Sequence, residues 1–376
     1  MRFRCRGGTP KEVLADADIE RTYVDPNNGQ LLGYLERGAP SKPVLFDPRQ
    51  QAIISRVYQA FPNRDLRIVE WTPDFSHFLV HTSGNGDSGT WYVVDVTGRR
   101  ADPVGYDYPM IATENVGPVS KVTYQAADGL EMDGILTLPP GGVTKNLPVV
   151  LLPHGGPTAY DPVAFDWWAQ AFASRGYAVF QPNFRGSTNR GDAFRRAGNG
   201  QWGRKMQSDI SDGLAELAKR GLVDPKRACI VGASYGGYAA LAGVTLQHGL
   251  YRCAVAVAPV SDLSDMYLTD LRVSGGSNML KNSLRESLGN PSTFAEVSPR
   301  KRAAQADAPI LLIHGKDDTV VPFKQSSAMA DALKDARKPY ELVVMPNEDH
   351  WLSRSATRQQ MLEAAVAFVE KNNPAN

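Results

Sequence analysis

The chain has 376 residues, and at about 150 residues per domain this length predicts two or three domains. Its 41 lysines and arginines against 40 aspartates and glutamates give a net charge of +1, so charge provides no reason to expect nucleic acid or an anionic membrane as a partner. With 42% hydrophobic and 22% charged residues, the composition is typical of a globular protein and excludes an extensively disordered one.

The cysteines and the chain start carry little signal for chemistry or targeting. Cys5, Cys229 and Cys253 are too few for a disulfide framework and are not spaced like metal ligands. Cys229 and Cys253 lie in apolar runs, where we expect small buried hydrophobic side chains. No apolar run reaches the roughly 18 residues that span a membrane, and none follows the basic start as a signal peptide requires. We therefore expect a cytoplasmic protein, unless a signal sequence precedes this chain.

Before residue 117, short β-rich runs alternate with turn clusters, and no helix is predicted. One pair of runs covers residues 31–35 and 43–46, and a second covers 78–82 and 91–96. The two pairs begin 47 residues apart. Because propeller blades of four strands repeat at about 40–50 residues, two blade-like units fit this spacing, and so does a plain β-meander. We expect residues 1–117 to form a β-rich segment of two to three blades.

Residues 118–376 follow a different pattern. Runs at 121–125 and 134–138 flank Ala-Asp-Gly and predict an antiparallel hairpin. Apolar strand-like runs then alternate with amphipathic stretches, and residues 261–305 interrupt them as a predicted cap or loop over the site. Short buried strands separated by helices predict an α/β fold, with a mostly parallel sheet covered by helices on both faces. The predicted strands are 148–152, 177–180, 228–231, 254–257, 310–313 and 342–345, and the predicted helices lie near 162–175, 205–220, 236–248, 324–337 and 356–371.

The segment Gly232-Ala-Ser-Tyr-Gly236 fits the pattern G-x-S-x-G. A predicted strand precedes it and a predicted helix follows, which is the context of a nucleophilic serine on a sharp turn. The flanking glycines suit this turn because a Cβ would clash at so tight a bend. The helix N-terminus behind Ser234 also favours negative charge on the reacting oxygen. We predict Ser234 as a nucleophile, and a glycine-rich turn with an incidental serine is the alternative.

A serine nucleophile needs a base and an orienting acid, which in α/β-hydrolases follow it in the order Ser, Asp or Glu, His. Of the six histidines, only His314 and His350 lie beyond the helix that follows Ser234. His314 precedes every acid in its loop, whereas His350 comes one strand after an acidic loop. We therefore predict His350 as the base. Asp318, with adjacent Asp317 as runner-up, is the acid that would hold its tautomer and stabilise the imidazolium.

The segment His154-Gly-Gly-Pro157 directly follows the predicted strand 148–152. In an α/β-hydrolase one oxyanion N–H comes from the residue after the nucleophile and the other from this loop. We therefore predict the N–H groups of Tyr235 and Gly156 as the oxyanion hole. A tight turn is the alternative reading of the loop. We expect His154 to pack beneath it without transferring protons.

No cofactor or metal site is predicted. Residues 198–203 read G-x-G-x-x-G, but they follow Phe194-Arg-Arg-Ala-Gly and not an apolar strand, so the context of a dinucleotide site is missing. The sequence contains neither a P-loop nor an H-E-x-x-H motif. Phosphate transfer and zinc chemistry therefore have no support.

Five motifs in order give residues 118–376 a resemblance to the prolyl oligopeptidase family of serine peptidases, with the acylaminoacyl-peptidase-like branch as the nearest. The motifs are HGGP at 154–157, NFRGST at 183–188, GASYGG at 232–237, HGKDDTVVP at 314–322 and EDH before Trp351. The resemblance implies hydrolysis of peptide bonds in short peptides through an acyl-enzyme on Ser234. It also assigns Asp318 and His350 as acid and base, and Gly156 and Tyr235 as oxyanion donors.

Members of this family carry an N-terminal β-propeller, typically of seven blades, that screens out large substrates. Residues 1–117 are too few for such a propeller, because propellers close with about four to eight blades. We therefore expect a small β-rich remnant of a propeller and favour the reading that the chain is the C-terminal part of a longer protein. Unclosed blades expose strand edges, which makes a homo-oligomer possible.

Three functions compete. The first is a serine peptidase acting on oligopeptides, of the acylaminoacyl-peptidase or dipeptidyl-peptidase kind. The second is a carboxylesterase on the same triad, because one fold hosts many acyl-transfer substrates. The third is a non-catalytic binding protein, against which the intact Ser234, Asp318 and His350 argue. The expected partner is an oligopeptide, without nucleic acid or membrane.

Overall fold

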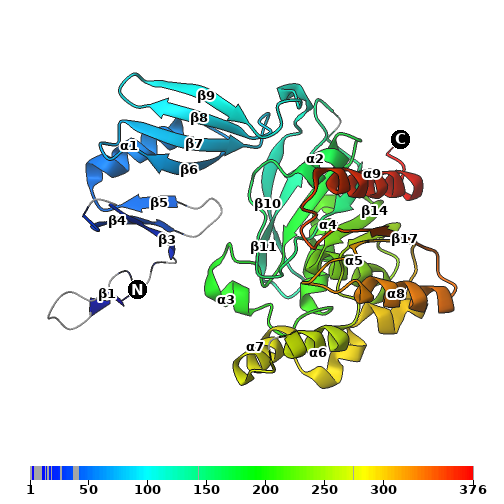
Figure 1. Cartoon of the computed structure of the whole chain (residues 1–376). Coiled ribbons are helices and arrows are strands. Elements are labelled where there is room, and N and C mark those ends of the chain that lie inside the picture. The colour runs from blue at the N-terminus through cyan, green and yellow to red at the C-terminus, as the bar shows by residue number, and fades with distance from the viewer. Residues whose placement is uncertain are drawn as a thin grey trace. The chain divides into compact units, whose positions relative to one another are not determined.

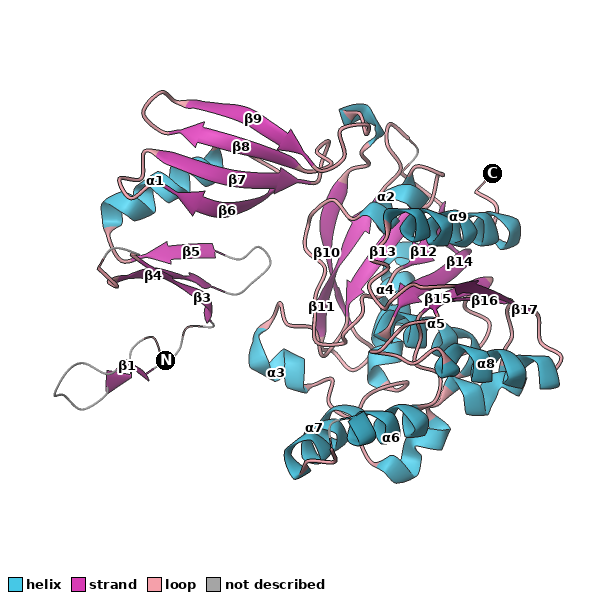
Figure 2. Ribbon diagram, in the orientation of Figure 1, coloured by secondary structure: helices cyan, strands magenta, loops and turns pink. Residues whose placement is uncertain are grey.

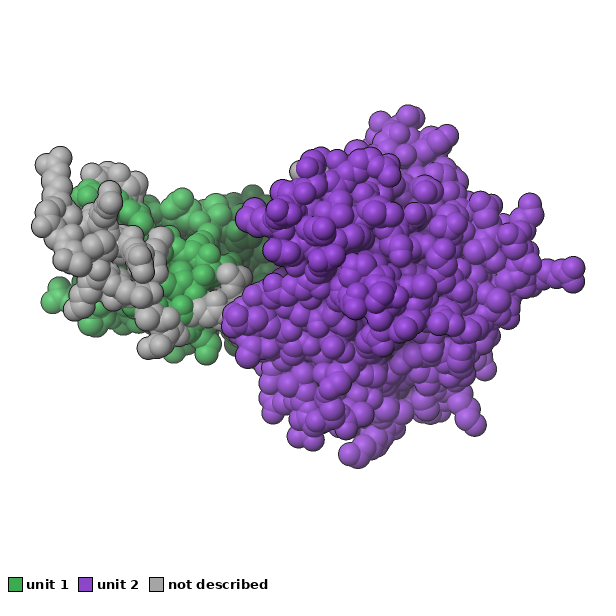
Figure 3. Space-filling view, turned by 90° about the horizontal axis from the view of Figure 1, so that it is seen from below, with its two compact units in different colours: residues 1–82, 90–106 green, residues 83–89, 107–376 purple. Residues whose placement is uncertain are grey.

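The computed structural model describes residues 2–3, 11–12, 14, 17, 19–25, 28–36, 42–142, 144–273 and 275–375. The chain forms two compact units, shown in separate colours in Figure 3. Unit 1 comprises Met1–Thr82 and Thr90–Tyr106, and unit 2 comprises Ser83–Gly89 and Asp107–Asn376. The boundary that the sequence pattern places at residue 117 stays a prediction.

Unit 1 is built from small sheets whose strands follow one another along the chain (Figure 1). A two-stranded sheet pairs β1 (Arg2–Phe3) with β2 (Lys11–Glu12), and a three-stranded sheet contains β3 (Ile19–Val24), β4 (Leu31–Glu36) and β5 (Lys42–Leu45). A four-stranded sheet contains β6 (Asp65–Trp71), β7 (His77–Ser83), β8 (Thr90–Asp95) and β9 (Arg100–Tyr106). This last sheet has the strand number of one propeller blade.

Unit 1 also contains a helix, so the prediction that no helix precedes residue 117 is wrong. Helix α1 (Pro48–Gln59) begins after Asp47, whose carboxylate accepts hydrogen bonds from the backbone N–H groups of Arg49 and Gln50. Proline at the first helical position suits this start. Only Ile54 and Val57 are buried, so the apolar face is too short to produce a clear helical pattern. The sequence signal for this helix was Asp47 followed by Pro48, which mark its start.

Unit 2 contains an eight-stranded sheet in the order β10-β11-β13-β12-β14-β15-β16-β17. Strands β10 and β11 form the predicted antiparallel hairpin, β11 pairs antiparallel with β13, and the other pairs are parallel. The predicted α/β class with a mostly parallel sheet is therefore confirmed. The strands are β10 (Val119–Gln125), β11 (Glu131–Thr137), β12 (Leu147–Leu151), β13 (Ala178–Asn183), β14 (Val223–Ala233), β15 (Cys253–Val257), β16 (Ile310–Gly315) and β17 (Tyr340–Met345).

Alternate residues of the central strands enter two separate cores, because successive side chains of a strand point to opposite faces. In β12, for example, Val149 packs with α4 (Lys205–Lys219), α5 (Tyr235–Thr245) and α8 (Lys324–Asp335). Val150 packs instead with the two helices on the other face. Helices α2 (Trp167–Ala173) and α9 (Ser355–Asn372) thus cover the opposite face of the sheet (Figure 2). Two-sided burial explains why these strands appear in the sequence as continuous apolar runs.

The interruption at residues 261–305 is helical. It contains α6 (Leu263–Val273), α7 (Asn278–Leu288) and the 3₁₀ helices η2 (Pro291–Glu296) and η3 (Pro299–Gln305). Element η3 contacts α5 and α8, so this segment packs onto one covered face of the sheet. Two further short elements, α3 (Gly191–Arg196) and the 3₁₀ helix η1 (Thr113–Asn115), were also not predicted.

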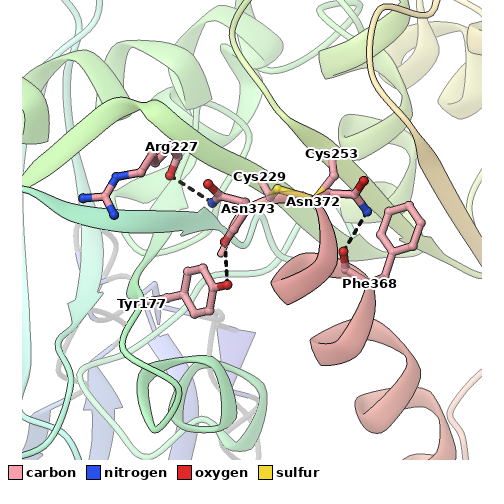
Figure 4. The surroundings of a disulfide bond; sticks show 7 residues. All are labelled: Tyr177, Arg227, Cys229, Cys253, Phe368, Asn372 and Asn373. Atoms are coloured by element: carbon pink, nitrogen blue, oxygen red, sulfur yellow. Dashed lines mark hydrogen bonds between the residues drawn. A yellow bond between two sulfur atoms is a disulfide. The ribbon is translucent and has the colours of Figure 1, made fainter. Parts of the chain in front are cut away.

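Cys229 and Cys253 form a disulfide bond between β14 and β15 (Figure 4). The two residues are register partners on adjacent parallel strands, with a Cα–Cα distance of 4.9 Å, and both are fully buried. Their predicted burial is confirmed, but the expectation of two separate small hydrophobes is wrong. The two cysteines are 24 residues apart in the chain, and this spacing does not indicate that their strands are neighbours in the sheet. Cys5 lies outside the described residues.

No helix within the described ranges combines the length and the apolar character that a membrane crossing requires.

Candidate active site

Ser234 lies on a sharp turn between β14 and α5. Its backbone has a φ of 57° and a ψ of −118°, and its N–H donates to the Val257 carbonyl at 2.9 Å. A Cβ on Gly232 would come within 2.5 Å of the Gly236 backbone, and one on Gly236 would collide with the Pro153 carbonyl oxygen. Both glycines are therefore required for the turn that presents Ser234 at the carboxyl edge of the sheet.

Asp318 and His350 meet at the same edge, although 32 residues separate them. They follow the neighbouring parallel strands β16 and β17. His350 Nδ1 lies 2.6 Å from Asp318 Oδ2. The N–H groups of Val320 and Val321 donate to the other carboxylate oxygen, each at 2.8 Å. The Asp318 side chain is fully buried, so these bonds fix both the acid and the imidazole that it holds.

His314, which the sequence offered as the other histidine, is fully buried behind the acid. Its Nε2 lies 2.9 Å from the Val321 carbonyl oxygen and 3.2 Å from Asp318 Oδ2, and its Nδ1 lies 2.7 Å from Ser326 Oγ. Because a carbonyl only accepts, Nε2 carries the hydrogen and Nδ1 accepts from the serine hydroxyl. His314 therefore supports Asp318 at Oδ2, the same carboxylate oxygen that His350 contacts. No sequence signal distinguished this role.

The charge on Asp318 is stabilised by its partners. Burial by itself would raise the pKa of this carboxyl, but hydrogen bonds from His314 and His350 outweigh it and hold the pKa well below its usual range. An ionised Asp318 accepts the Nδ1 hydrogen of His350 and leaves Nε2 available to take up a proton. The runner-up Asp317 is solvent-exposed, and its backbone N–H donates to the Glu348 carbonyl.

The HGGP loop lies directly against the nucleophile turn. A Cβ placed on Gly155 would lie 3.5 Å from Ser234 Cβ. Gly156 has a φ of 117°, and no residue that the structure describes accepts a hydrogen bond from its N–H. The Tyr235 N–H is the first of helix α5 and has no acceptor within that helix. Two uncommitted N–H donors beside Ser234 are consistent with the predicted oxyanion hole.

His154 is held as a support of this loop. Its ring stacks on Phe184 at a centroid distance of 4.4 Å, and its two nitrogens lie 2.8 Å from the Gly155 carbonyl and 2.9 Å from Ser187 Oγ. Burial lowers the pKa of His154 to about 4, so the imidazole is neutral at physiological pH. Both nitrogens are engaged, and this agrees with the supporting role expected from the sequence.

The NFRGST segment holds the same region in place through ion pairs and hydrogen bonds. The Arg185 guanidinium bonds the buried carboxylate of Asp209 on α4 at 2.8 Å and also binds Asp128 at 2.9 Å. Asn183 binds both backbone atoms of Asp161, accepting from its N–H at 2.8 Å and donating to its carbonyl at 3.1 Å. These bonds fix the loop that follows the HGGP motif.

The structure thus joins Asp318 to His350 and sets the HGGP loop beside Ser234. Within the described part of the chain, neither Ser234 Oγ nor His350 Nε2 makes a hydrogen bond, and both are available for a substrate. The pairing of these two atoms stays a prediction, as do the catalytic roles of the predicted residues.

Known proteins share this architecture and sequence. The chain is 30% identical over 372 residues to dipeptidyl aminopeptidase BIII of Pseudoxanthomonas mexicana, covering 95% of this chain and 53% of that protein. It is 27% identical over 257 residues to the acylamino-acid-releasing enzyme of Rattus norvegicus, covering 67% of this chain and 35% of the enzyme. The chain therefore spans about half the length of the bacterial relative, and less of the rat enzyme.

Solved structures match the fold of nearly the whole chain. A puromycin-hydrolyzing peptidase of Mycobacterium tuberculosis superposes with a TM-score of 0.81 at 23% identity, covering 99% of this chain and 58% of that one. The acylaminoacyl peptidase of Pyrococcus horikoshii gives a TM-score of 0.77 at 22% identity, covering 98% and 58%. The family model described as the prolyl oligopeptidase family matches residues 163–374. The chain therefore belongs to the prolyl oligopeptidase family, as its motifs predicted.

Proposed function

We propose that the protein is a serine peptidase that hydrolyses short peptides through an acyl-enzyme on Ser234. The observation that carries this proposal is the 2.6 Å contact of the buried Asp318 carboxylate with His350, at the sheet edge where the strained turn presents Ser234. A fixed acid–imidazole pair at that edge supplies the base that a serine nucleophile requires.

In the proposed mechanism, His350 Nε2 takes the hydroxyl proton as Ser234 Oγ attacks the scissile carbonyl carbon. The carbonyl oxygen gains negative charge, and the N–H groups of Gly156 and Tyr235 donate to it. The tetrahedral intermediate collapses when His350 returns the proton to the departing amine. Water then attacks the acyl-enzyme by the same route and releases the acid. Throughout, Asp318 stabilises the imidazolium form of His350.

The finer assignment is to an enzyme that removes an acylated residue or a dipeptide from an N-terminus. Its support is that the named relatives include a dipeptidyl aminopeptidase and an acylamino-acid-releasing enzyme. A carboxylesterase on the same residues is the alternative, because the triad itself does not discriminate amides from esters.

Turnover of matched substrates tests the proposal. We expect the protein to hydrolyse both a dipeptide β-naphthylamide and a p-nitrophenyl ester, and Ser234→Ala to abolish both activities. If only the ester is hydrolysed, the protein is a carboxylesterase and the peptidase assignment is wrong. Activity that survives in Ser234→Ala would contradict the nucleophile itself.

The compartment predicted from the sequence is the cytoplasm, and this stays a prediction. The Cys229–Cys253 bond argues in the other direction, because disulfides persist mainly in oxidising compartments. Fractionation of the native cell, followed by thiol labelling with and without reductant, would decide between the two.

A further inference from the structure

His350 lies in an irregular loop between β17 and α9 (Figure 1). We call residues 346–354, which form neither helix nor strand, the His350 loop. The contact with Asp318 orients the imidazole ring, but it does not fix the backbone that carries the ring. Loop backbone lacks the regular hydrogen bonds of a helix or a sheet, so other groups must hold it.

One side chain holds this backbone on both sides of His350. Glu348 is only 2% exposed. Its Oε1 accepts hydrogen bonds from the backbone N–H groups of Asp349 and Ser353, each at 3.0 Å. Its Oε2 accepts from the hydroxyl of Thr357, which belongs to the first turn of α9. A single carboxylate group therefore joins residues before and after His350 to the start of a packed helix.

The backbone of Glu348 lies against the chain segment that precedes Asp318. Its carbonyl accepts the Asp317 N–H at 3.0 Å. A Cβ on Gly315, the last residue of β16, would collide with the same carbonyl oxygen. The loop with the predicted base and the loop with the predicted acid thus meet at Glu348. A shift of Glu348 would therefore change how His350 lies against Asp318.

The Glu348 side chain costs more to bury than an apolar side chain of its size. A buried carboxylate loses its hydration, and its hydrogen bonds offset that cost without a large net gain in stability. Its three donors instead fix a geometry, because each hydrogen bond has a narrow range of distance and angle. Catalytic groups need such fixing, since a misplacement of about 1 Å can cost about 10²-fold in rate.

We propose that Glu348 is a positioning residue that keeps the His350 imidazole in place between Asp318 and Ser234. It acts through the backbone of the His350 loop and does not touch the substrate. The proposal rests on the proposed peptidase function of Ser234 and deepens it. The acceptor oxygens of Glu348, and not the volume of its side chain, then set the rate of the chemical step.

Two substitutions of Glu348 separate hydrogen bonding from packing. Glu348→Met keeps the length of the side chain and removes its acceptors. In Glu348→Gln the amide oxygen still accepts from the two backbone N–H groups. The amide N–H donates to the Thr357 hydroxyl, whose hydrogen then goes to the Arg354 carbonyl, 2.9 Å away. For β-naphthylamide hydrolysis we expect kcat to fall about 10- to 100-fold in Glu348→Met, with KM within about threefold, and to recover to within about fivefold in Glu348→Gln.

Proton NMR of the protein without substrate reports the same positioning directly. The Nδ1 hydrogen that His350 donates to Asp318 gives a far-downfield resonance when the bond is held, and His350→Ala identifies that resonance. We expect it in the wild-type protein and in Glu348→Gln. In Glu348→Met it should broaden or disappear, because a looser loop exposes the hydrogen to exchange with water. A role of Glu348 in packing alone would leave the resonance unchanged.

Val369→Ala is the control for a loss of stability. Val369 is fully buried and lies on the same helix as Thr357. Its truncation should lower Tm through the cavity that it leaves, while kcat stays within about threefold of the wild-type value. Thr357→Val removes the hydroxyl that contacts Glu348 Oε2, and it serves if Glu348→Met does not fold. We expect its kcat to fall by about three- to tenfold, the effect of one hydrogen bond.

Three results would each overturn the inference. The first is a wild-type kcat in Glu348→Met, or in Thr357→Val if only that variant folds. The second is a loss of kcat in Glu348→Gln or in Val369→Ala that equals the loss in Glu348→Met. The third is an unchanged resonance in Glu348→Met. Failure of the proposed function is distinguishable from these, because the wild-type protein would then hydrolyse no substrate and Ser234 would not react with a fluorophosphonate, while the resonance would still report the position of His350.

Discussion

Two aspartates at the carboxyl edge of the same sheet are held in opposite ways. Asp318 receives hydrogen bonds from His350 and from the backbone of Val320 and Val321, and its pKa lies below the usual range. Asp161 has a buried oxygen without a partner, and its pKa lies above the usual range. The surroundings of Asp318 stabilise the charged carboxylate, whereas burial at Asp161 favours the neutral carboxyl. The comparison separates a buried carboxylate that its partners keep charged from a buried carboxyl group that has no such partners.

The largest expected effect is that of Asp318→Asn on turnover. An amide at this position leaves the side chain in place but no longer stabilises the imidazolium form of His350. We expect kcat to fall by about 10⁴-fold, the loss typical of a triad acid changed to its amide. Steady-state turnover of the β-naphthylamide measures it.

Asp317→Asn is the matched control for that change, because Asp317 is the exposed neighbour in the same loop. It should retain turnover within about threefold of the wild-type rate. A comparable loss in both variants would show that the loop, and not the Asp318 carboxylate, is being tested.

The next largest effect concerns the support behind Asp318. His314→Ala removes the Nε2 donor that lies 3.2 Å from the Asp318 carboxylate. We expect kcat to fall by about 10- to 100-fold with a smaller change in KM, since a buried donor to a charged group contributes about 1.5–3 kcal/mol. His314→Gln, which restores an amide donor, should recover part of kcat. Equal kcat values in the two variants would show that His314 contributes through packing and not through its hydrogen bond to Asp318.

A third prediction concerns the sheet beneath both aspartates. The double change Cys229→Ala and Cys253→Ala removes a crosslink between residues 24 apart. We expect the free energy of unfolding to fall by about 2–4 kcal/mol, measured by denaturant titration without reductant. Unchanged stability would indicate that the two thiols are not bonded in the purified protein.

The smallest effects are in stability, and they should have opposite signs. Asp318 contributes stability above the ordinary aspartate pKa of about 3.9, and this contribution is lost as the pH falls through its lowered folded-state pKa. Asp161, with a raised pKa, instead costs stability above that value. At neutral pH we therefore expect Asp318→Asn to lower Tm and Asp161→Asn to raise it, each by about 2–4 °C per kcal/mol.

The sign test is completed at acidic pH. Both differences should shrink as the pH falls below about 4. The Asp161 carboxyl is then neutral in the unfolded as well as the folded state, and the contribution of Asp318 is lost progressively as the pH approaches its lowered folded-state pKa. Scanning calorimetry of the three proteins at neutral and acidic pH measures this. A stabilising Asp318→Asn, or a destabilising Asp161→Asn at neutral pH, would remove the contrast on which the comparison rests.

Much of the fold and the candidate triad could be predicted because local patterns encode them. Buried strands produce continuous apolar runs. Gly232 and Gly236 mark the turn because a side chain at either position would clash with the backbone. The order of Ser234, Asp318 and His350 along the chain then limits the choice of acid and base.

Other features depend on tertiary contacts and had no local signal. The disulfide forms because β14 and β15 are neighbours in the sheet. The order of strands in a sheet cannot be predicted from the spacing of two cysteines in the sequence. The support from His314 and the orphan oxygen of Asp161 follow from which loops meet. Helix α1 was missed for a different reason: its buried face consists of Ile54 and Val57, which is too little to produce a periodic pattern.

The central claim is that Ser234 is the nucleophile of a peptidase. The most direct measurement is mass spectrometry of the protein after reaction with a fluorophosphonate at neutral pH, with peptide mapping and a parallel assay of β-naphthylamide turnover. We predict one adduct, on Ser234, whose formation abolishes turnover in step with labelling. An adduct on another residue, or full turnover after Ser234 is labelled, would contradict the account.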